Sequence, residues 1–106
     1  MSECLFCKIV KGEIPGTCVY QDKNLIVIED IHPAAPVHVL IIPKKHVDDF
    51  MGASETLLGQ IFSAAKKLIK EKHITHYRLV NNGGGAAFIE HLHVHLLGSV
   101  AQDRNL

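Results

Sequence analysis

Three histidines alternate with apolar residues near the end of the chain, in the order His91, Leu92, His93, Val94, His95. Successive side chains of a β-strand point to opposite faces, so a strand here would place the three imidazoles on one face and the apolar side chains on the other. Imidazole changes charge near neutral pH and can act as a base, a nucleophile or a metal ligand. The row therefore predicts a reaction centre or a metal chelate, the alternative being a polar face exposed to solvent.

A run of glycines, Gly83–Gly85, precedes the histidine segment. Glycines allow backbone N–H groups to approach an anion closely. Because this loop leads into the histidines, we expect free amides and imidazoles to meet at one place, which would suit a phosphate group. Taken alone, the run is equally typical of a flexible turn.

Cys4 and Cys7 form a second pattern with chemical potential. On a helix this spacing brings two sulfurs together on one face, where they could supply half of a tetrahedral metal site. In a chain with three cysteines and no sign of export, the spacing favours a metal site or a redox motif over a structural disulfide. Two free thiols are the alternative.

The elements that must position these residues follow from periodicity and turn signals. We expect a short helix over residues 3–11, with Ser2 as its N-cap, and a long amphipathic helix over residues 55–72, with Ser54 as its N-cap. Strands are predicted at 17–21, 25–29, 37–42, 76–81 and 92–97. Consecutive strands are expected to pair antiparallel, which gives a single α+β domain over residues 1–106.

Composition limits the possible partners. The chain has 106 residues, 47% of them apolar, and a formal net charge of zero, so it offers no broad basic face to nucleic acid. Aromatic residues make up 6% and tryptophan is absent, which argues against a base-stacking platform. Neither a signal peptide nor a run of membrane-spanning length is recognisable, so we expect a cytoplasmic protein without a membrane partner.

The histidine segment resembles the signature of the histidine triad (HIT) family, in which three histidines alternate with apolar residues and two further apolar residues follow. The resemblance extends to CLFCKIVKGEIP, EDIHPAAPVHVLIIPKKH and YRLVNN, and it spans the chain from Cys4 to Gly98. These segments are similar to those of nucleoside phosphoramidases. The resemblance implies a twisted five-stranded antiparallel sheet with one long and one short helix, and a homodimer with one continuous ten-stranded sheet.

The same resemblance implies an activity: hydrolysis of the bond to the α-phosphate of AMP-type purine nucleotides through a nucleotidyl-histidine intermediate. His93 would be the nucleophile, and the backbone carbonyl of His91 would fix its tautomer. His95 and His38 would donate hydrogen bonds to the phosphate oxygens as charge develops.

The remaining implied roles concern the nucleotide and a metal. Asp30 would hold the ribose, and Gly85 and Asn82 would lie at the phosphate, with Asn81 as an alternative to Asn82. The base would lie in an apolar slot, although each of its residues could equally be ordinary core: Leu5, Phe6, Ile9, Ile28 and Ile31. A structural zinc would be held by Cys4, Cys7, His46 and His91, and would fix His91. No role is implied for His32, His73 and His76, which we interpret as surface residues.

The chain departs from the family pattern in two places, the loop before His91 and the C-terminal segment. Ala87 and Phe88 stand where the family usually has a glutamine and a serine or threonine, the loop before His91 is shorter, and the usual C-terminal ending is absent. We therefore expect weak phosphoramidase activity or an altered leaving-group preference. Two other functions stay open: a catalytically weak nucleotide-binding sensor, and a metal protein in which the triad histidines are the chelate.

Overall fold

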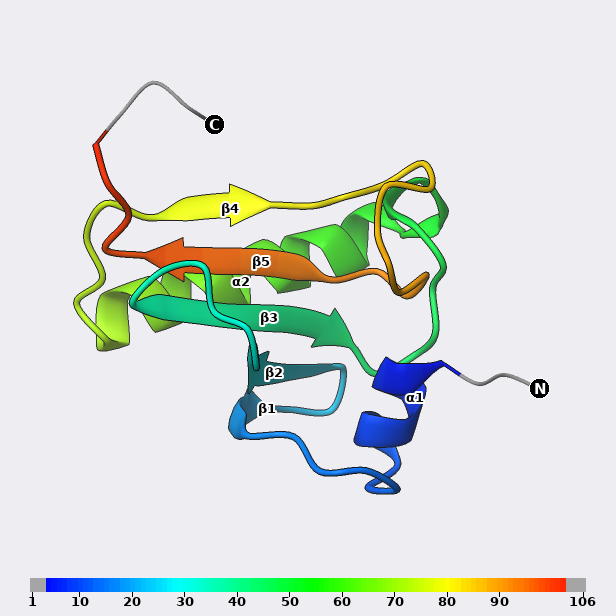
Figure 1. The fold of residues 1–106 in the computed structure, drawn as a ribbon. Helices are drawn as coiled ribbons and strands as arrows, with labels where there is room; N and C mark the ends of the chain where they lie inside the picture. Colours follow the sequence, from blue (N-terminus) through cyan, green and yellow to red (C-terminus); the bar gives the residue numbers. More distant parts are fainter. Residues whose placement is uncertain (1–3, 103–106) are drawn as a thin grey trace.

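The computed structural model describes residues 4–102 and contains a single sheet flanked by helices (Figure 1). In chain order the elements are α1 (Leu5–Val10), β1 (Cys18–Gln21), β2 (Leu25–Glu29), β3 (Val37–Pro43), the 3-10 turn η1 (Phe50–Gly52), α2 (Glu55–Glu71), β4 (Arg78–Val80) and β5 (Val94–Gly98). All strand pairs are antiparallel. The predicted α+β fold, with five strands, one long helix and one short helix, is confirmed. In the described part of the chain, no helix is both long and apolar enough to cross a membrane.

The last strand of the sequence lies inside the sheet, whose order is β1-β2-β3-β5-β4. β5 pairs with β3 on one side and with β4 on the other, so β3 and β4 are not neighbours. The expectation that consecutive strands pair is therefore wrong at this point. After β3 the chain runs through α2 to β4, which lies one strand away from β3. β5 then occupies the position between β3 and β4. This order places His95 directly opposite Leu40 of β3.

The two faces of the sheet carry different cores because side chains alternate along each strand. On one face, α2 packs through Ile61, Ala64, Ala65 and Leu68 against side chains of β2, β3 and β5. The other face carries a smaller cluster in which Phe6 of α1 packs with Ile26, Ile28, Leu40 and Ile42. The triad follows this alternation: Leu92, Val94 and Leu96 belong to the α2 core, so the histidines between them face the side of α1.

The helix ends are capped by side chains. Ser54 Oγ accepts a hydrogen bond from the N–H of Leu57 at 3.0 Å, which confirms the predicted start of α2. The predicted cap Ser2 lies outside the described residues. Cys4 is the N-cap of α1, and its sulfur accepts from the N–H of Cys7 at 3.3 Å.

β4 and β5 are shorter than the predicted strands 76–81 and 92–97. His76 adopts a left-handed conformation with φ of 52°, which ends any extended run before β4. Before β5, the N–H of Leu92 donates to the carbonyl of Val47 and the carbonyl of His93 accepts from Asn81 Nδ2. These backbone groups bond outside the sheet ladder, so His91 and His93 precede the strand and His95 is the triad histidine that lies within it.

Candidate active site

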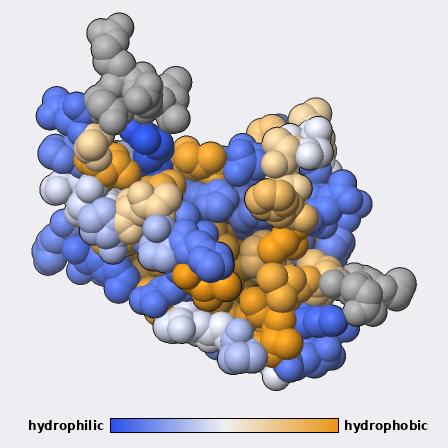
Figure 2. Space-filling model, in the orientation of Figure 1, coloured by the Kyte–Doolittle hydropathy of each residue, from blue (hydrophilic) through white to orange (hydrophobic). Residues whose placement is uncertain are grey.

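A cavity of about 580 Å³ lies on the face of the sheet that carries α1. Its sides are formed by α1 and the turn after it, by the end of β2 and the residues that follow, and by the loop between β4 and β5. His93 and His95 lie in its lining. Figure 2 shows hydrophobic surface gathered on this side, where α1 and the loop before β5 meet. The cavity size is typical of a small-molecule site.

His93 is held in one orientation and one tautomer. Its Nδ1 lies 2.8 Å from the backbone carbonyl oxygen of His91, which can only accept, so the proton is on Nδ1. The lone pair is then on Nε2, the nitrogen that a nucleophile requires. The ring is buried, and the edge of the Phe6 ring packs against it at a centroid distance of 4.9 Å. This is the tautomer that the family resemblance implies.

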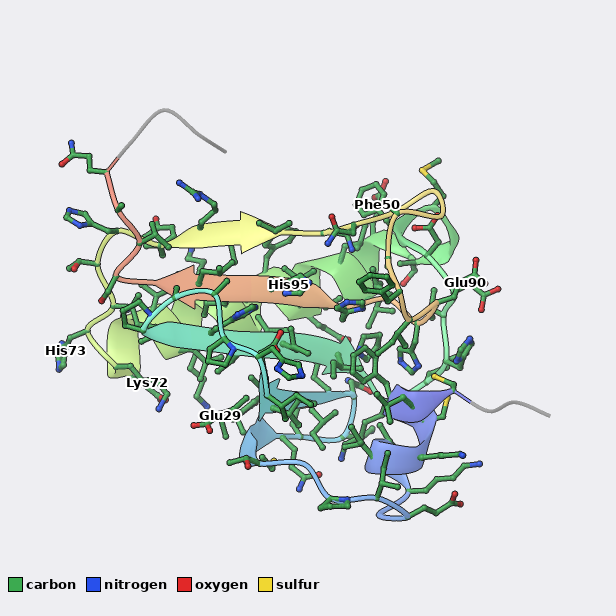
Figure 3. All side chains as sticks on the ribbon, in the orientation of Figure 1. Glu29, Phe50, Lys72, His73, Glu90 and His95 are labelled. Carbon is green, nitrogen blue, oxygen red and sulfur yellow. The ribbon has the colours of Figure 1, made fainter. Side chains whose placement is uncertain are left out.

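A hydrogen-bond relay fixes His38 and His95, the latter in the middle of the sheet (Figure 3). The backbone N–H of Ala34 donates to His38 Nδ1 at 3.0 Å, so His38 carries its proton on Nε2. That nitrogen lies 2.9 Å from His95 Nδ1 and donates to it. His95 therefore has its proton on Nε2. Burial lowers the pKa of His95, and the charges of His93 and His38 lower it further.

Asp30 completes this group, with Oδ2 at 3.3 Å from His38 Nε2 and Oδ1 accepting from the N–H of His32 at 2.8 Å. Asp30, His38 and His95 each offer an atom close enough to share a metal ion. Ligation through His38 Nε2 would require its proton to move to Nδ1, which would break the bond from Ala34. The geometry thus favours a hydrogen-bonded relay over a chelate.

A second cluster joins Cys4, Cys7, His46 and His91, whose ligand atoms all lie within 4.8 Å of one another. His91 Nδ1 is 3.2 Å from Cys4 Sγ and 3.6 Å from Cys7 Sγ, and His46 Nδ1 is 3.2 Å from Cys7 Sγ. Tetrahedral zinc, with its usual bonds to sulfur and nitrogen, separates the two ligand atoms by about 3.6 Å. These three sulfur–nitrogen distances agree with such an ion to within a few tenths of an ångström.

The Nε2 atoms of His91 and His46, which face away from the sulfurs, have hydrogen-bond partners of the kind that metal-binding histidines use. His91 Nε2 donates to the carbonyl of Pro43 at 2.8 Å, and His46 Nε2 contacts Asp48 Oδ1 at 2.6 Å. Such partners orient metal-binding imidazoles. His91 is fully buried, and burial lowers its pKa, so the ring is held in the neutral form that binds metals. The Cys4–Cys7–His46–His91 cluster and His93 thus share His91, whose ring contacts the two sulfurs and whose carbonyl accepts from His93 Nδ1.

The glycine loop is placed by a residue that sequence reasoning missed. Asp49 Oδ2 accepts from the N–H of Gly84 at 3.1 Å, and the N–H of Ala86 donates to the carbonyl of Gly83. These two amides are therefore bonded within the protein, so within the predicted run Gly84 does not offer the free N–H that was expected for a phosphate. Gly85 is exposed and does not contribute to the cavity lining. Asp49 and Gly84 are 35 residues apart, and a side-chain contact over this separation leaves no recognisable local pattern in the sequence.

The two asparagines after β4 have separate positions. Asn82 lines the cavity, whereas Asn81 Nδ2 donates to the carbonyl of His93 at 3.0 Å and fixes the backbone of that residue. Asp30 and the five residues of the apolar slot also line the cavity, namely Leu5, Phe6, Ile9, Ile28 and Ile31. Ile31 is 86% exposed and Leu5 44% exposed, so these two are not core residues.

Several lining residues were not anticipated. His32 is exposed, as interpreted from the sequence, and it also lies in the cavity lining beside Ile31. The segment between Asn82 and His91 contributes Ala86–Ile89, of which Ala87 and Phe88 were singled out from the sequence and Ala86 and Ile89 were not. His32 follows Asp30 and Ile31 directly in the sequence, and that proximity is the signal that could have identified it.

The HIT domain family model matches residues 11–102 of the chain. The 14 kDa zinc-binding protein of Zea mays is 41% identical, over 92% of this chain and 82% of that protein. A HIT family hydrolase from Clostridium thermocellum superimposes with a TM-score of 0.89 and 44% identity, covering 100% of this chain and 98% of the other. A zinc-bound histidine triad family protein from Mycobacterium smegmatis has a TM-score of 0.85 and 28% identity, covering 96% and 78% of the two chains. With a family model that extends over most of its length and relatives this similar, the chain belongs to the HIT family.

Proposed function

We propose that this protein is a nucleotidyl hydrolase that cleaves purine nucleoside 5′-phosphoramidates. The orientation of His93 carries the proposal, because its Nδ1 is bonded to the His91 carbonyl and its Nε2 is left with a lone pair in a nucleotide-sized cavity. Its relative from Clostridium thermocellum is described as a hydrolase, which supports the general reaction class.

The reaction has two steps. His93 Nε2 attacks the α-phosphorus, the bond from phosphorus to the leaving amine breaks, and the amine takes up a proton from water. Water then attacks the nucleotidyl-imidazole, gives its proton to solvent, and releases the nucleoside monophosphate with neutral His93. Covalent catalysis of this kind divides one difficult displacement into two easier ones.

The other histidines stabilise the charge that develops on the phosphate. His95 carries its proton on Nε2 because His38 donates to its Nδ1, so His95 is a neutral hydrogen-bond donor. Asp30, at the end of β2, is suited to the ribose hydroxyls, and Leu5, Ile9 and Ile28 supply an apolar slot for the base. Donors that are already oriented in the free protein lower the barrier without a cost of reorganisation.

We propose zinc for the four-residue cluster of Cys4, Cys7, His46 and His91, with a structural role. Four protein ligands close the coordination sphere and leave no position for an activated water. The relatives described as zinc-binding and zinc-bound support this assignment. Thiolate ligands are retained in a reducing compartment, in keeping with the proposed cytoplasmic location.

A homodimer is part of the proposal. Within residues 4–102, no strand pairs with the outer edge of β4, so this edge could continue the sheet into a second copy. Sedimentation of the purified protein tests this directly, since a mass equal to one chain would exclude the dimer.

The decisive experiment measures hydrolysis of adenosine 5′-phosphoramidate by the wild type and by His93→Ala. We expect turnover by the wild type alone. His73→Asn is the matched control, because His73 lies outside the cavity and asparagine tolerates its left-handed conformation, with φ of 53°. Equal turnover by His93→Ala and the wild type would refute the role of His93.

A second function is favoured by one observation: Ala87 and Phe88 bring no hydrogen-bond donor side chain to the cavity wall. A nucleotide-binding sensor of low catalytic power would need none. Binding of AMP without turnover of the phosphoramidate would identify that function.

A further inference from the structure

Cys4 and Cys7 have a spacing that serves a metal site and equally a redox-active dithiol, and both functions would use the same two sulfurs. The N–H of Lys8 donates to the carbonyl of Cys4 at 3.1 Å, so the two cysteines lie on one closed helical turn. Cα atoms three residues apart in such a turn are separated by about 5 Å, which is within the range that a disulfide bridges. Both sulfurs already lie against the same atom, His91 Nδ1, at 3.2 and 3.6 Å. The two sulfurs can therefore join with little change of the backbone.

The pair is accessible to a small oxidant. Both side chains are partly exposed, and Cys7 Sγ contacts the exposed residue His46 at 3.2 Å. The third cysteine, Cys18, is exposed on β1 and lies outside the cluster that joins the other two. Of the three thiols, two are thus placed to react with each other and one is not.

A peroxide would oxidise this pair in two balanced steps. One sulfur attacks the peroxide, the O–O bond breaks, and water leaves with the thiol proton, which gives a sulfenic acid. The other sulfur then attacks the first, the S–S bond forms, the S–O bond breaks, and a second water leaves with the second thiol proton. The two sulfurs together lose two electrons, and the peroxide gains them. If the sulfurs start as thiolates on the proposed zinc, solvent supplies both protons.

Disulfide formation would release α1 at its first turn. There, Cys4 and Cys7 contact His91, which precedes β5. Cys7 also contacts His46, which follows β3. The thiolate is the form of cysteine that binds a metal, and a disulfide has none, so both connections would be lost together. The main remaining attachment is the buried ring of Phe6, and a helix of six residues is not stable on its own.

We propose that Cys4 and Cys7 form a reversible oxidation site, at which a peroxide closes a disulfide, expels the proposed zinc and loosens α1. Since α1 carries Leu5, Phe6 and Ile9 of the cavity lining, oxidation would also alter the proposed nucleotide site. The inference rests on the proposed function for these effects on zinc and nucleotide. The disulfide and the state of α1 can be measured without either.

The test uses the wild-type protein, loaded with zinc and exposed to hydrogen peroxide before alkylation and digestion with trypsin. Cleavage after lysine places Cys4 and Cys7 together on the peptide Met1–Lys8 and Cys18 on the peptide Gly12–Lys23. We expect Met1–Lys8 to lose two hydrogen atoms and to take up no alkyl group, and zinc to leave in step with this change. Hydrogen exchange of the α1 amides should accelerate by about tenfold or more, while that of α2 stays unchanged. Dithiothreitol with added zinc should reverse all of these changes.

A variant and an internal reference make the test specific. Cys4→Ser removes the second sulfur, so Cys7 should gain oxygen atoms instead of losing hydrogen, because no thiol of the cluster is left to condense with its sulfenic acid. Cys18 reports whether the peroxide dose suffices, since it is exposed and lies outside the cluster.

The outcomes separate this inference from the proposed function. Alkylation of both Cys4 and Cys7 at a peroxide dose that oxidises Cys18 would overturn the inference and leave the proposed zinc intact. A disulfide to Cys18 or between two chains would also overturn it, as would an internal disulfide that leaves the zinc content or the exchange of α1 unchanged. If the protein purified under reducing conditions binds no zinc, the proposed metal fails, and the peptide masses and exchange rates still decide whether the pair is an oxidation site.

Discussion

Removal of the proposed zinc should weaken the proposed nucleotide binding, because one short helix carries residues of both sites. α1 has six residues and carries Cys7, with Cys4 at its N-cap, as well as Leu5, Phe6 and Ile9 of the cavity lining. Isolated helices of this length are not stable in water. The attachment of α1 to the sheet therefore depends on what its side chains contact.

The free energy that attaches α1 to the sheet can be estimated from its contacts. Ordering the backbone of six residues costs about 6–12 kcal/mol. Burial of Phe6 and partial burial of Ile9 and Val10 return about 4–8 kcal/mol. These two quantities nearly cancel, so α1 without a metal is at best marginally attached. A structural zinc contributes about 10–16 kcal/mol of apparent binding free energy and changes this balance completely.

We therefore expect chelation to weaken the binding of AMP by about 5–150-fold, the range of an ordinary coupling free energy. Titration calorimetry of zinc-loaded and chelated protein would measure it. Thermodynamic linkage requires that AMP tighten zinc binding by the same factor, which is a second measurement on the same samples. An AMP dissociation constant that is unchanged by chelation, with zinc loss verified by elemental analysis, would refute the reasoning.

Three further predictions concern single groups. Restoring donors with Ala87→Gln and Phe88→Ser should raise turnover of unsubstituted adenosine phosphoramidate by about 10²–10³, and equal turnover would mean that these positions do not limit the rate. Asp49→Ala removes the acceptor for the N–H of Gly84, so hydrogen exchange of the loop amides should accelerate while that of α2 does not. The pKa of His95 is lowered from 6.5, chiefly by burial, so its contribution to stability is present above pH 6.5 and is lost as the pH falls through the folded-state pKa. Urea unfolding at pH 7.5 and 5.5 should therefore show a larger loss for the wild type than for His95→Gln.

Local patterns predicted the features that depend on a few neighbouring residues. The alternation of His91 to His95 correctly separates the α2 core from the histidine face. The spacing of Cys4 and Cys7 correctly brings two sulfurs to one cluster. The apolar period of α2 and its cap at Ser54 depend only on helix geometry, and both are found.

Features that depend on strand order could not be derived in this way. The bond between His38 and His95 exists because β5 lies beside β3, and pairing of consecutive strands would have separated them. Burial of His91 and His93 depends on how α1 covers the sheet, as their ring contacts with Phe6 show. The hydrogen bond between Asp49 and the N–H of Gly84 joins residues 35 positions apart, and no local propensity indicates such a contact.

The central position of β5 also governs when the site can form. His38 and His95 are 57 residues apart, and β5, which carries His95, is synthesised after the other four described strands. Until that strand arrives, the facing edges of β3 and β4 are open, and open edges invite pairing with other chains. Contacts at such separation form slowly because the intervening chain must first be ordered. The cavity can thus be completed only after β5 has been synthesised, and a chain truncated before Val94 would leave the facing edges of β3 and β4 unpaired and would lack the strand that carries His95.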